Sequence, residues 1–133
     1  MKIPCEIVVW YVLPTIRREV AKELVRTHGM SQATVAKRFD VTDAAISQYL
    51  KKKRGENHII ESSSHYDEFL DEIRISAEHI AKEQADFATE MCRICTFVKK
   101  SGLLAKIYEE QMGCKPPTCA CSKEYGLTQI KSE

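Results

Sequence analysis

The sequence has little glycine and proline, with 5 and 4 residues respectively among 133. Sandwiches and barrels of β-strands need many turns built on these residues, so the scarcity argues against such folds and favours helices. Hydrophobic residues make up 44% of the chain and charged residues 29%, which leaves enough apolar surface for a core. We therefore predict an all-α fold, organised as one domain or as two small modules.

The sequence also lacks a long hydrophobic run. The longest uncharged apolar stretch, Ile7 to Leu13, has seven residues, whereas a helix that spans a bilayer needs roughly 18 to 20. Pro4 and Glu6 interrupt what resembles the start of a signal peptide, and no cleavage site follows. We therefore expect a cytoplasmic protein with no membrane partner. The β-branched and aromatic residues of the stretch are typical of a strand, but continuous apolar spacing toward Pro14 favours a short helix that kinks there.

Motifs of catalysis are absent as well. The sequence contains no glycine-rich loop of the kind that cradles phosphate and no nucleophile motif. Its four histidines are scattered along the chain, at His28, His58, His65 and His79. We therefore do not expect an enzyme.

The net charge of +1 conceals an uneven distribution. Residues 1–55 hold 11 Lys and Arg against 5 Asp and Glu, residues 56–90 hold 2 against 10, and residues 91–133 hold 7 against 4. A basic segment followed by an acidic one is typical of a protein in which only one part contacts nucleic acid. The alternative is a chance imbalance on solvated helix faces.

A helix-turn-helix is predicted in residues 31–54, after a first helix that runs from Pro14 to about His28. Ser31 can cap a helix over Gln32–Phe39, and Thr42 can cap a second helix over Asp43–Leu50 that continues into four basic residues. Two helices that cross steeply need a small residue where they touch, and Ala36 supplies it. The alternative is a helical hairpin with a basic exposed face.

This segment resembles the lambda-repressor-like family of transcription regulators, with Gln32 at the start of the first helix and Ile46 and Ser47 in the second. Where the family has a left-handed Gly the chain has Asp40, a residue type that tolerates that conformation. The resemblance implies that the second helix enters the major groove of double-stranded DNA, where Gln48 suits adenine. The implied base-reading residues are Asp43, Ala44, Ala45, Ser47 and Gln48. The residues implied to contact the DNA backbone or to support the helix are Gln32, Lys37, Arg38, Thr42, Lys51, Lys52, Lys53 and Arg54.

A linker is predicted after this module, followed by one long helix within residues 63–100. The Ser64 to Asp67 segment matches a capping box, which would open the helix. Apolar residues then recur at alternating four- and three-residue steps. The resulting heptad seam consists of Tyr66, Leu70, Ile73, Ala77, Ile80, Gln84, Phe87, Met91, Ile94 and Val98.

This seam is either an interface with a partner helix or the core face of a single helix. A short chain offers so long a helix little else to pack against, so we expect a homodimer. Gln84, as the one polar residue of the seam, would fix its register. A dimer would also suit a pseudo-palindromic DNA site.

Five of the six cysteines fall within the last 42 residues, at Cys92, Cys95, Cys114, Cys119 and Cys121. Without a secretory signal, such residues are expected as metal ligands or redox thiols rather than as disulfides. A short helix over residues 102–112, ended by Gly113, would fold back as a hairpin and bring the two cysteine groups together. We expect Cys92, Cys95, Cys119 and Cys121 as ligands, with Cys114 as a fifth candidate.

Four thiolates suit tetrahedral Zn²⁺ or a [4Fe–4S] cluster, and the irregular spacing without a nearby histidine favours the cluster. The whole chain resembles archaeal XRE-type regulators with a cysteine-rich carboxyl terminus proposed to carry an iron–sulfur cluster. The resemblance rests on residues 4–8, the helix-turn-helix, and the run from Cys92-Arg93-Ile94-Cys95 to residues 101–104.

The expected organisation is a DNA-binding module with linker in residues 1–62, a dimerisation helix in 63–100 and a metal-binding segment in 101–133. The expected function is that of a homodimeric transcription regulator whose DNA affinity depends on a cysteine-ligated [4Fe–4S] cluster. One alternative is a DNA-binding regulator with a structural Zn²⁺ site. The other is an electron carrier or enzyme with an accessory helix-turn-helix.

Overall fold

The structure, a computed structural model, describes residues 4–51 and 55–113. Within these ranges the chain is helical and has no strand, which confirms the predicted all-α class. No helix in the described part of the chain has both the length and the apolar character that crossing a membrane requires. The helices are α1 (Pro4–Ile7), η1 (Val8–Val12), α2 (Leu13–Arg26), α3 (Gln32–Phe39), α4 (Asp43–Leu50), α5 (His58–Glu61), α6 (Tyr66–Ala81), α7 (Phe87–Lys100) and α8 (Leu103–Met112).

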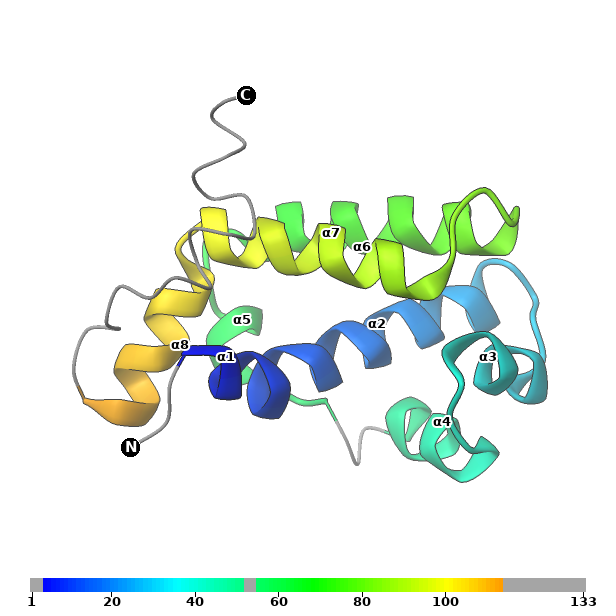
Figure 1. Ribbon diagram of the computed structural model, residues 1–133, viewed down its shortest axis with the longest axis horizontal. Helices are drawn as coiled ribbons and strands as arrows, with labels where there is room; N and C mark the ends of the chain where they lie inside the picture. The colour runs from blue at the N-terminus through cyan, green and yellow to red at the C-terminus, as the bar shows by residue number, and fades with distance from the viewer. Residues whose placement is uncertain (1–3, 52–54, 114–133) are drawn as a thin grey trace.

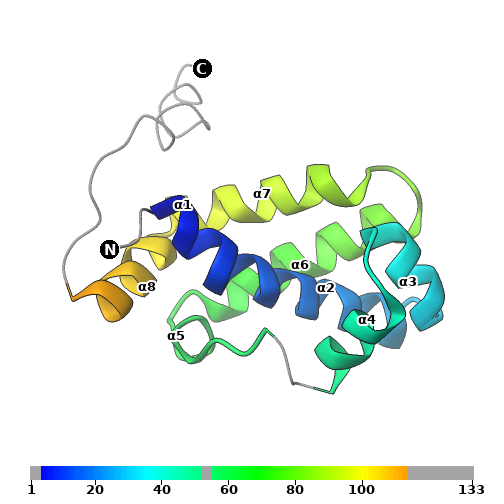
Figure 2. The ribbon, with the colours of Figure 1, turned by 60° about the horizontal axis from the view of Figure 1, so that its bottom comes forward.

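Helix α2 lies at the centre of the arrangement and packs against α4, α6 and α7. Figures 1 and 2 show α3 and α4 at one end of the molecule and α8 at the other. The buried side chains form one core, to which α2 contributes Ile16, Val20 and Leu24. That core includes residues of both the expected DNA-binding module and the expected dimerisation helix.

The amino-terminal stretch is helical, as predicted, and leads into α2 without a break. Its middle part, η1, is one turn of π-helix, in which the Leu13 N–H bonds to the Val8 carbonyl. Pro14, which has no N–H to donate, follows within the first turn of α2. The wider turn therefore accommodates the proline inside a continuous helical segment.

The prediction of one long helix over residues 63–100 is wrong. Helix α6 ends at Ala81, and Glu83 has a left-handed backbone with φ of 56°. Asp86 then caps α7 by accepting a hydrogen bond from the Thr89 N–H at 2.8 Å. The chain reverses at this turn, so α6 and α7 pack side by side in opposite directions (Figure 1).

Most of the predicted seam is buried within the single chain. Gln84 is exposed in the turn and lies in no helix, so it fixes no helix register. Tyr66, Leu70 and Phe87 are half-buried. The buried members are Ile73, Ala77, Ile80, Met91, Ile94 and Val98. The seam is therefore the core face of a helix pair within one chain. It is not an interface with a partner helix.

The structure also differs from the predictions for the linker and for the capping box. The linker contains α5, whose preceding residue Asn57 accepts hydrogen bonds from the Ile59 and Ile60 N–H groups, both at 3.1 Å. Helix α6 begins after His65, and the Ser63 hydroxyl rather than Ser64 accepts the His65 N–H at 3.0 Å. The connection is therefore folded against the core.

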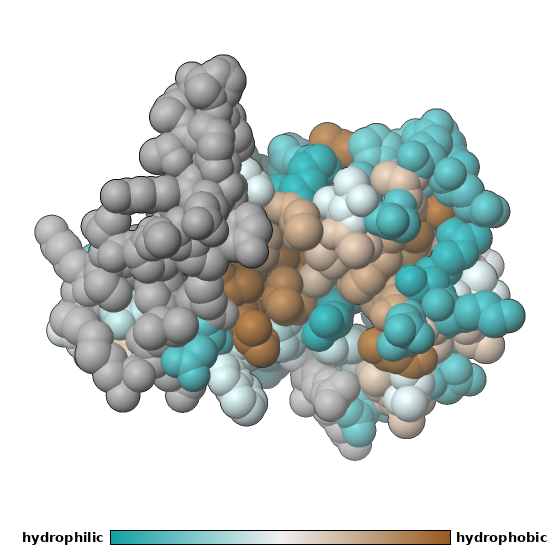
Figure 3. Space-filling view, viewed as in Figure 1, coloured by the Kyte–Doolittle hydropathy of each residue, from teal (hydrophilic) through white to brown (hydrophobic). Residues whose placement is uncertain are grey.

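Most of the described apolar side chains are buried or half-buried, but some remain on the surface. Val9 and Trp10 of η1 are 56% and 64% exposed, and Ile75 of α6 is 43% exposed. Figure 3 shows hydrophobic surface gathered in the middle of one face of the molecule.

Candidate nucleic-acid interface and cysteine site

Helices α3 and α4 have the bounds and caps that the sequence predicts. The Ser31 hydroxyl accepts the Thr34 N–H, and the Thr42 hydroxyl accepts the Ala45 N–H, both at 3.1 Å. Asp40 adopts the left-handed conformation expected there, with φ of 57° and ψ of 47°. These local interactions end one helix and start the next within three residues.

Burial fixes which sides of the two helices face inward. Val35 and Phe39 of α3, with Ile46 and Tyr49 of α4, are at most 4% exposed. Ala36, the small residue expected at the contact, is 2% exposed, and α3 and α4 pack against each other. Helix α4 also packs against α2, so its orientation is set by the core.

The opposite side of α4 is exposed and carries small and polar side chains. Ala44 and Gln48 are exposed and stand four residues apart, so they share one face, and Lys51 extends that face. Ser47 beside them is half-buried. The remaining exposed residues of the predicted set are Gln32, Lys37, Thr42 and Asp43. The predicted contacts Lys52, Lys53 and Arg54 lie outside the described residues.

Two residues predicted to contact DNA have other partners in the structure. Ala45 is only 9% exposed and belongs to the core, so its methyl group is not presented to a ligand. The Arg38 guanidinium donates to the Ile80 carbonyl at 2.7 Å and contacts the Glu83 carboxylate at 3.5 Å. Arg38 thus joins the end of α3 to the end of α6, a role that only the tertiary structure reveals.

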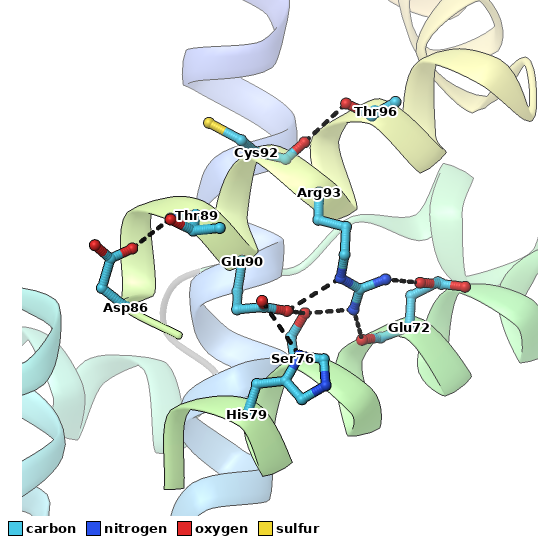
Figure 4. A network of polar contacts seen from close by, with 9 residues as sticks. All are labelled: Glu72, Ser76, His79, Asp86, Thr89, Glu90, Cys92, Arg93 and Thr96. Atoms are coloured by element: carbon cyan, nitrogen blue, oxygen red, sulfur yellow. Dashed lines mark hydrogen bonds and ion pairs between the residues drawn. The ribbon is translucent and has the colours of Figure 1, made fainter. Parts of the chain in front are cut away.

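Cys92 and Cys95 lie in the middle of α7 rather than at the end of a long helix. Cys92 is exposed, Cys95 is half-buried, and both line one groove. Figure 4 shows the Cys92 sulfur on the side of α7 away from the Glu90 carboxylate. Burial raises the pKa of the Cys95 thiol, and nearby Lys99 only partly opposes the shift.

The other expected ligands, Cys114, Cys119 and Cys121, lie outside the described residues. Within residues 4–51 and 55–113, no group of three or more His, Cys, Asp or Glu side chains is placed to hold a metal ion. The predicted short helix is confirmed as α8, between the left-handed residues Gly102 and Gly113. It packs against α1 and α5 as well as α7.

A partly buried polar network that the sequence did not predict joins α6 to α7 (Figure 4). The Ser76 hydroxyl donates to the Glu90 carboxylate at 2.7 Å, and Arg93 donates to the same carboxylate at 3.0 Å. Arg93 also pairs with Glu72, and His79 lies 3.2 Å from the other Glu90 oxygen. Burial alone would raise the pKa of Glu90, but the bonds from Ser76, Arg93 and His79 lower it below its ordinary value.

Only the spacing of Glu90 and Arg93, three residues apart, hints at this network in the sequence.

Comparison of the chain with models of protein families, with curated proteins and with solved structures finds no match.

Proposed function

We propose that the protein is a cytoplasmic, DNA-binding transcription regulator that reads DNA with the exposed face of α4. The observation that carries the proposal is the α3–α4 pair, two capped helices joined through the left-handed Asp40. The inner sides of both helices are buried, while the outer side of α4 bears Ala44 and Gln48. Such a small, polar helix face suits the major groove, which admits an α-helix.

The exposed side chains have distinct roles in this proposal. Gln48 pairs with adenine, and Ala44 contacts the methyl group of thymine. Lys37 and Lys51 contact phosphates, which positions the helix without reading sequence. Arg38 is omitted because its guanidinium already binds Ile80 and Glu83.

A homodimer on a pseudo-palindromic site remains part of the proposal, because a pair of such helices reads two half-sites. The predicted seam does not provide the interface, since Ile73, Ala77 and Ile80 are buried inside the chain. A dimer that keeps this fold uses other surface residues.

We further propose that a [4Fe–4S] cluster bound by cysteine thiolates modulates the DNA affinity. Cys92 and Cys95 fit part of such a site because they stand one turn apart on α7 and line the same groove. Cys119, Cys121 and the fifth candidate Cys114 would complete it. When bound, the cluster supplies redox sensitivity. A structural Zn²⁺ on the same thiolates is the alternative.

Selection of bound sequences from a random pool of double-stranded DNA tests the reading role of α4. The full chain is expected to enrich a defined motif. Gln48→Ala should relax one base position and cost about 1 to 3 kcal/mol of specific binding. Gln84→Ala, which changes an exposed glutamine in the α6–α7 turn, should keep the motif.

A phosphate contact gives a different result. Lys51→Ala should weaken binding to all sequences alike and reduce the salt slope by roughly one. If the wild-type chain enriches no motif, or if Gln48→Ala and Gln84→Ala enrich the same one, α4 is not the reading helix.

A further inference from the structure

A groove runs between α7 and the segment formed by η1 and α2, and it reaches the carboxyl end of α3. Its volume is about 660 Å³, within the range of small-molecule sites. Apolar side chains from η1, α2, α3 and α7 line it, among them Val8, Leu13, Phe39, Phe87 and Met91. Figure 3 shows hydrophobic surface in the middle of the face on which α7 lies. The groove therefore favours a ligand with an apolar body.

One end of the groove is aromatic. The rings of Phe39 and Phe87 stack with their centroids 4.0 Å apart and an interplanar angle of 19°. Phe39 is buried, but Phe87 is only half-buried and lines the groove. The stacked pair holds the ring of Phe87 in place, so this wall is preformed.

Arg17 of α2 also lines the groove, and its interactions are incomplete. Its Nε atom is buried without a hydrogen-bond partner, and none of the ion pairs among the described residues involves it. Arg17 as a whole is half-buried, so its positive charge lies in the wall of a mostly apolar groove without a carboxylate partner among the described residues. Arg17 is therefore the group to which a ligand's polar end would bind.

The other charged residues of the lining do not offer the same contact. Arg38 is bound by Ile80 and Glu83. Asp86 accepts the Thr89 N–H, and hydrogen bonding to Thr89 lowers the pKa of Asp86. Asp40 is exposed, so water hydrates its carboxylate. Of the charged residues that line the groove, Arg17 alone is half-buried and has no ion-pair partner among the described residues, which selects an anionic ligand.

We propose that this groove binds a small carboxylic acid with an apolar body. The body lies on Leu13, Phe87 and Met91, and the carboxylate pairs with the planar guanidinium of Arg17, which can donate two parallel hydrogen bonds. The inference does not rest on DNA binding, because occupancy of the groove is measured without DNA.

Titration calorimetry of the full chain with decanoate tests the proposal, with decylammonium as the probe of equal chain length and opposite charge. Decanoate should bind with one-to-one stoichiometry, and decylammonium should bind at least tenfold more weakly. Ala88→Trp fills the groove from an exposed position and should abolish decanoate binding. Arg17→Gln should weaken it at least tenfold. Arg26→Gln, an exposed arginine on the same helix, should leave it unchanged.

Each result supports or overturns one element of the proposal. Absence of decanoate binding, or equal binding by wild type and Ala88→Trp, overturns the groove as the site. Equal affinity for decanoate and decylammonium overturns the role of Arg17. If circular dichroism shows that Arg17→Gln does not fold, Arg17→Lys replaces it. Lysine lacks the planar fork of arginine, so this variant should bind decanoate severalfold more weakly. Unchanged affinity for decanoate would contradict the proposed pairing.

Discussion

The Asn57 side chain donates a hydrogen bond from Nδ2 to the backbone carbonyl of Tyr11 at 2.8 Å, across 46 residues of sequence. Its Oδ1 atom caps α5 at the same time. A second bond, from the Thr15 hydroxyl to the Gly55 carbonyl at 2.8 Å, lies beside it. The segment that enters α5 is therefore fixed to η1 and α2.

Replacing Asn57 by Ala should lower the free energy of unfolding by about 2 to 3 kcal/mol, because the cap is lost and the partly buried Tyr11 carbonyl loses a donor. Asn57→Asp keeps the cap oxygen and should lose only part of that stability. Urea unfolding measures both. Glu56→Ala, at the exposed neighbouring position, serves as the control; equal midpoints for it and Asn57→Ala would contradict this anchoring role.

Gly55→Ala should destabilise the chain by more than Gly29→Ala does. Both glycines have left-handed backbones, with φ of 82° and 67°, which cost an alanine roughly 1 to 2 kcal/mol. A Cβ atom at Gly55 would also lie 2.6 Å from the Pro14 carbonyl oxygen, whereas one at Gly29 meets nothing within 4 Å. Thermal unfolding compares the two variants, and equal melting temperatures would show that Gly55 does not pack this closely.

Ile73→Ala should lower stability by about 2 to 5 kcal/mol through the cavity that it leaves, without changing the oligomeric state. Ile73 is 1% exposed within the single chain. Sedimentation velocity at a fixed concentration, alongside urea unfolding, separates the two effects. A shift to a smaller species with unchanged stability would mean that Ile73 belongs to an interface between chains.

Glu90→Gln should remove a pH-dependent part of the stability. Although burial opposes the shift, hydrogen bonds from Ser76, Arg93 and His79 hold the pKa of Glu90 below its ordinary value of 4.5. The stabilisation is therefore fully present above pH 4.5 and is lost as the pH falls through the lower pKa of the folded state.

The measurement for Glu90 is the unfolding free energy of wild type and Glu90→Gln across this acidic range. At neutral pH the variant should be less stable by roughly 1.5 to 3 kcal/mol, the value of hydrogen bonds to a charged group. The difference should shrink on acidification. A difference that is independent of pH would assign the loss to packing alone.

Cys92 and Cys95 should differ in reactivity in the metal-free protein. Burial raises the pKa of Cys95, so less of it is thiolate at a given pH, while Cys92 is exposed. Iodoacetamide should therefore alkylate Cys92 first, and the rate at Cys95 should rise with pH over a higher range. Peptide mass spectrometry reports each site; faster reaction at Cys95 would contradict the burial of its thiol.

Protein purified without oxygen extends this test to the proposed cluster. A bound cluster should give broad visible absorption and should protect both thiols from alkylation. Cys92→Ser or Cys95→Ser should remove the colour, whereas Cys5→Ser should keep it. A colourless protein with stoichiometric zinc would support the structural metal site instead.

The α3–α4 region could be predicted from sequence because its signals are local. Ser31 and Thr42 each supply a cap oxygen to an N–H three residues later, and Asp40 tolerates a left-handed backbone. The sequence could not separate Ala44 from Ala45, since two adjacent alanines differ only in which one faces the core.

The α6–α7 turn could not be predicted from the apolar repeat. The heptad spacing continues through the turn without a glycine or proline to interrupt it, and the left-handed residue there is Glu83. Asp86, with Thr89 three residues later, was the one local sign of a new helix start. Because of this helix break, Ile73 and Ile94 both belong to one core within the chain rather than to a dimer seam.

The central position of α2 bears on how this chain can be made and shortened. During synthesis the face of α2 that packs on α6 and α7 stays uncovered until those later helices have left the ribosome. A fragment that stops near residue 62 would keep that apolar face in water and invite aggregation. We therefore do not expect the segment with α3 and α4 to fold on its own. Fusions or truncations of this protein should retain the chain through α7.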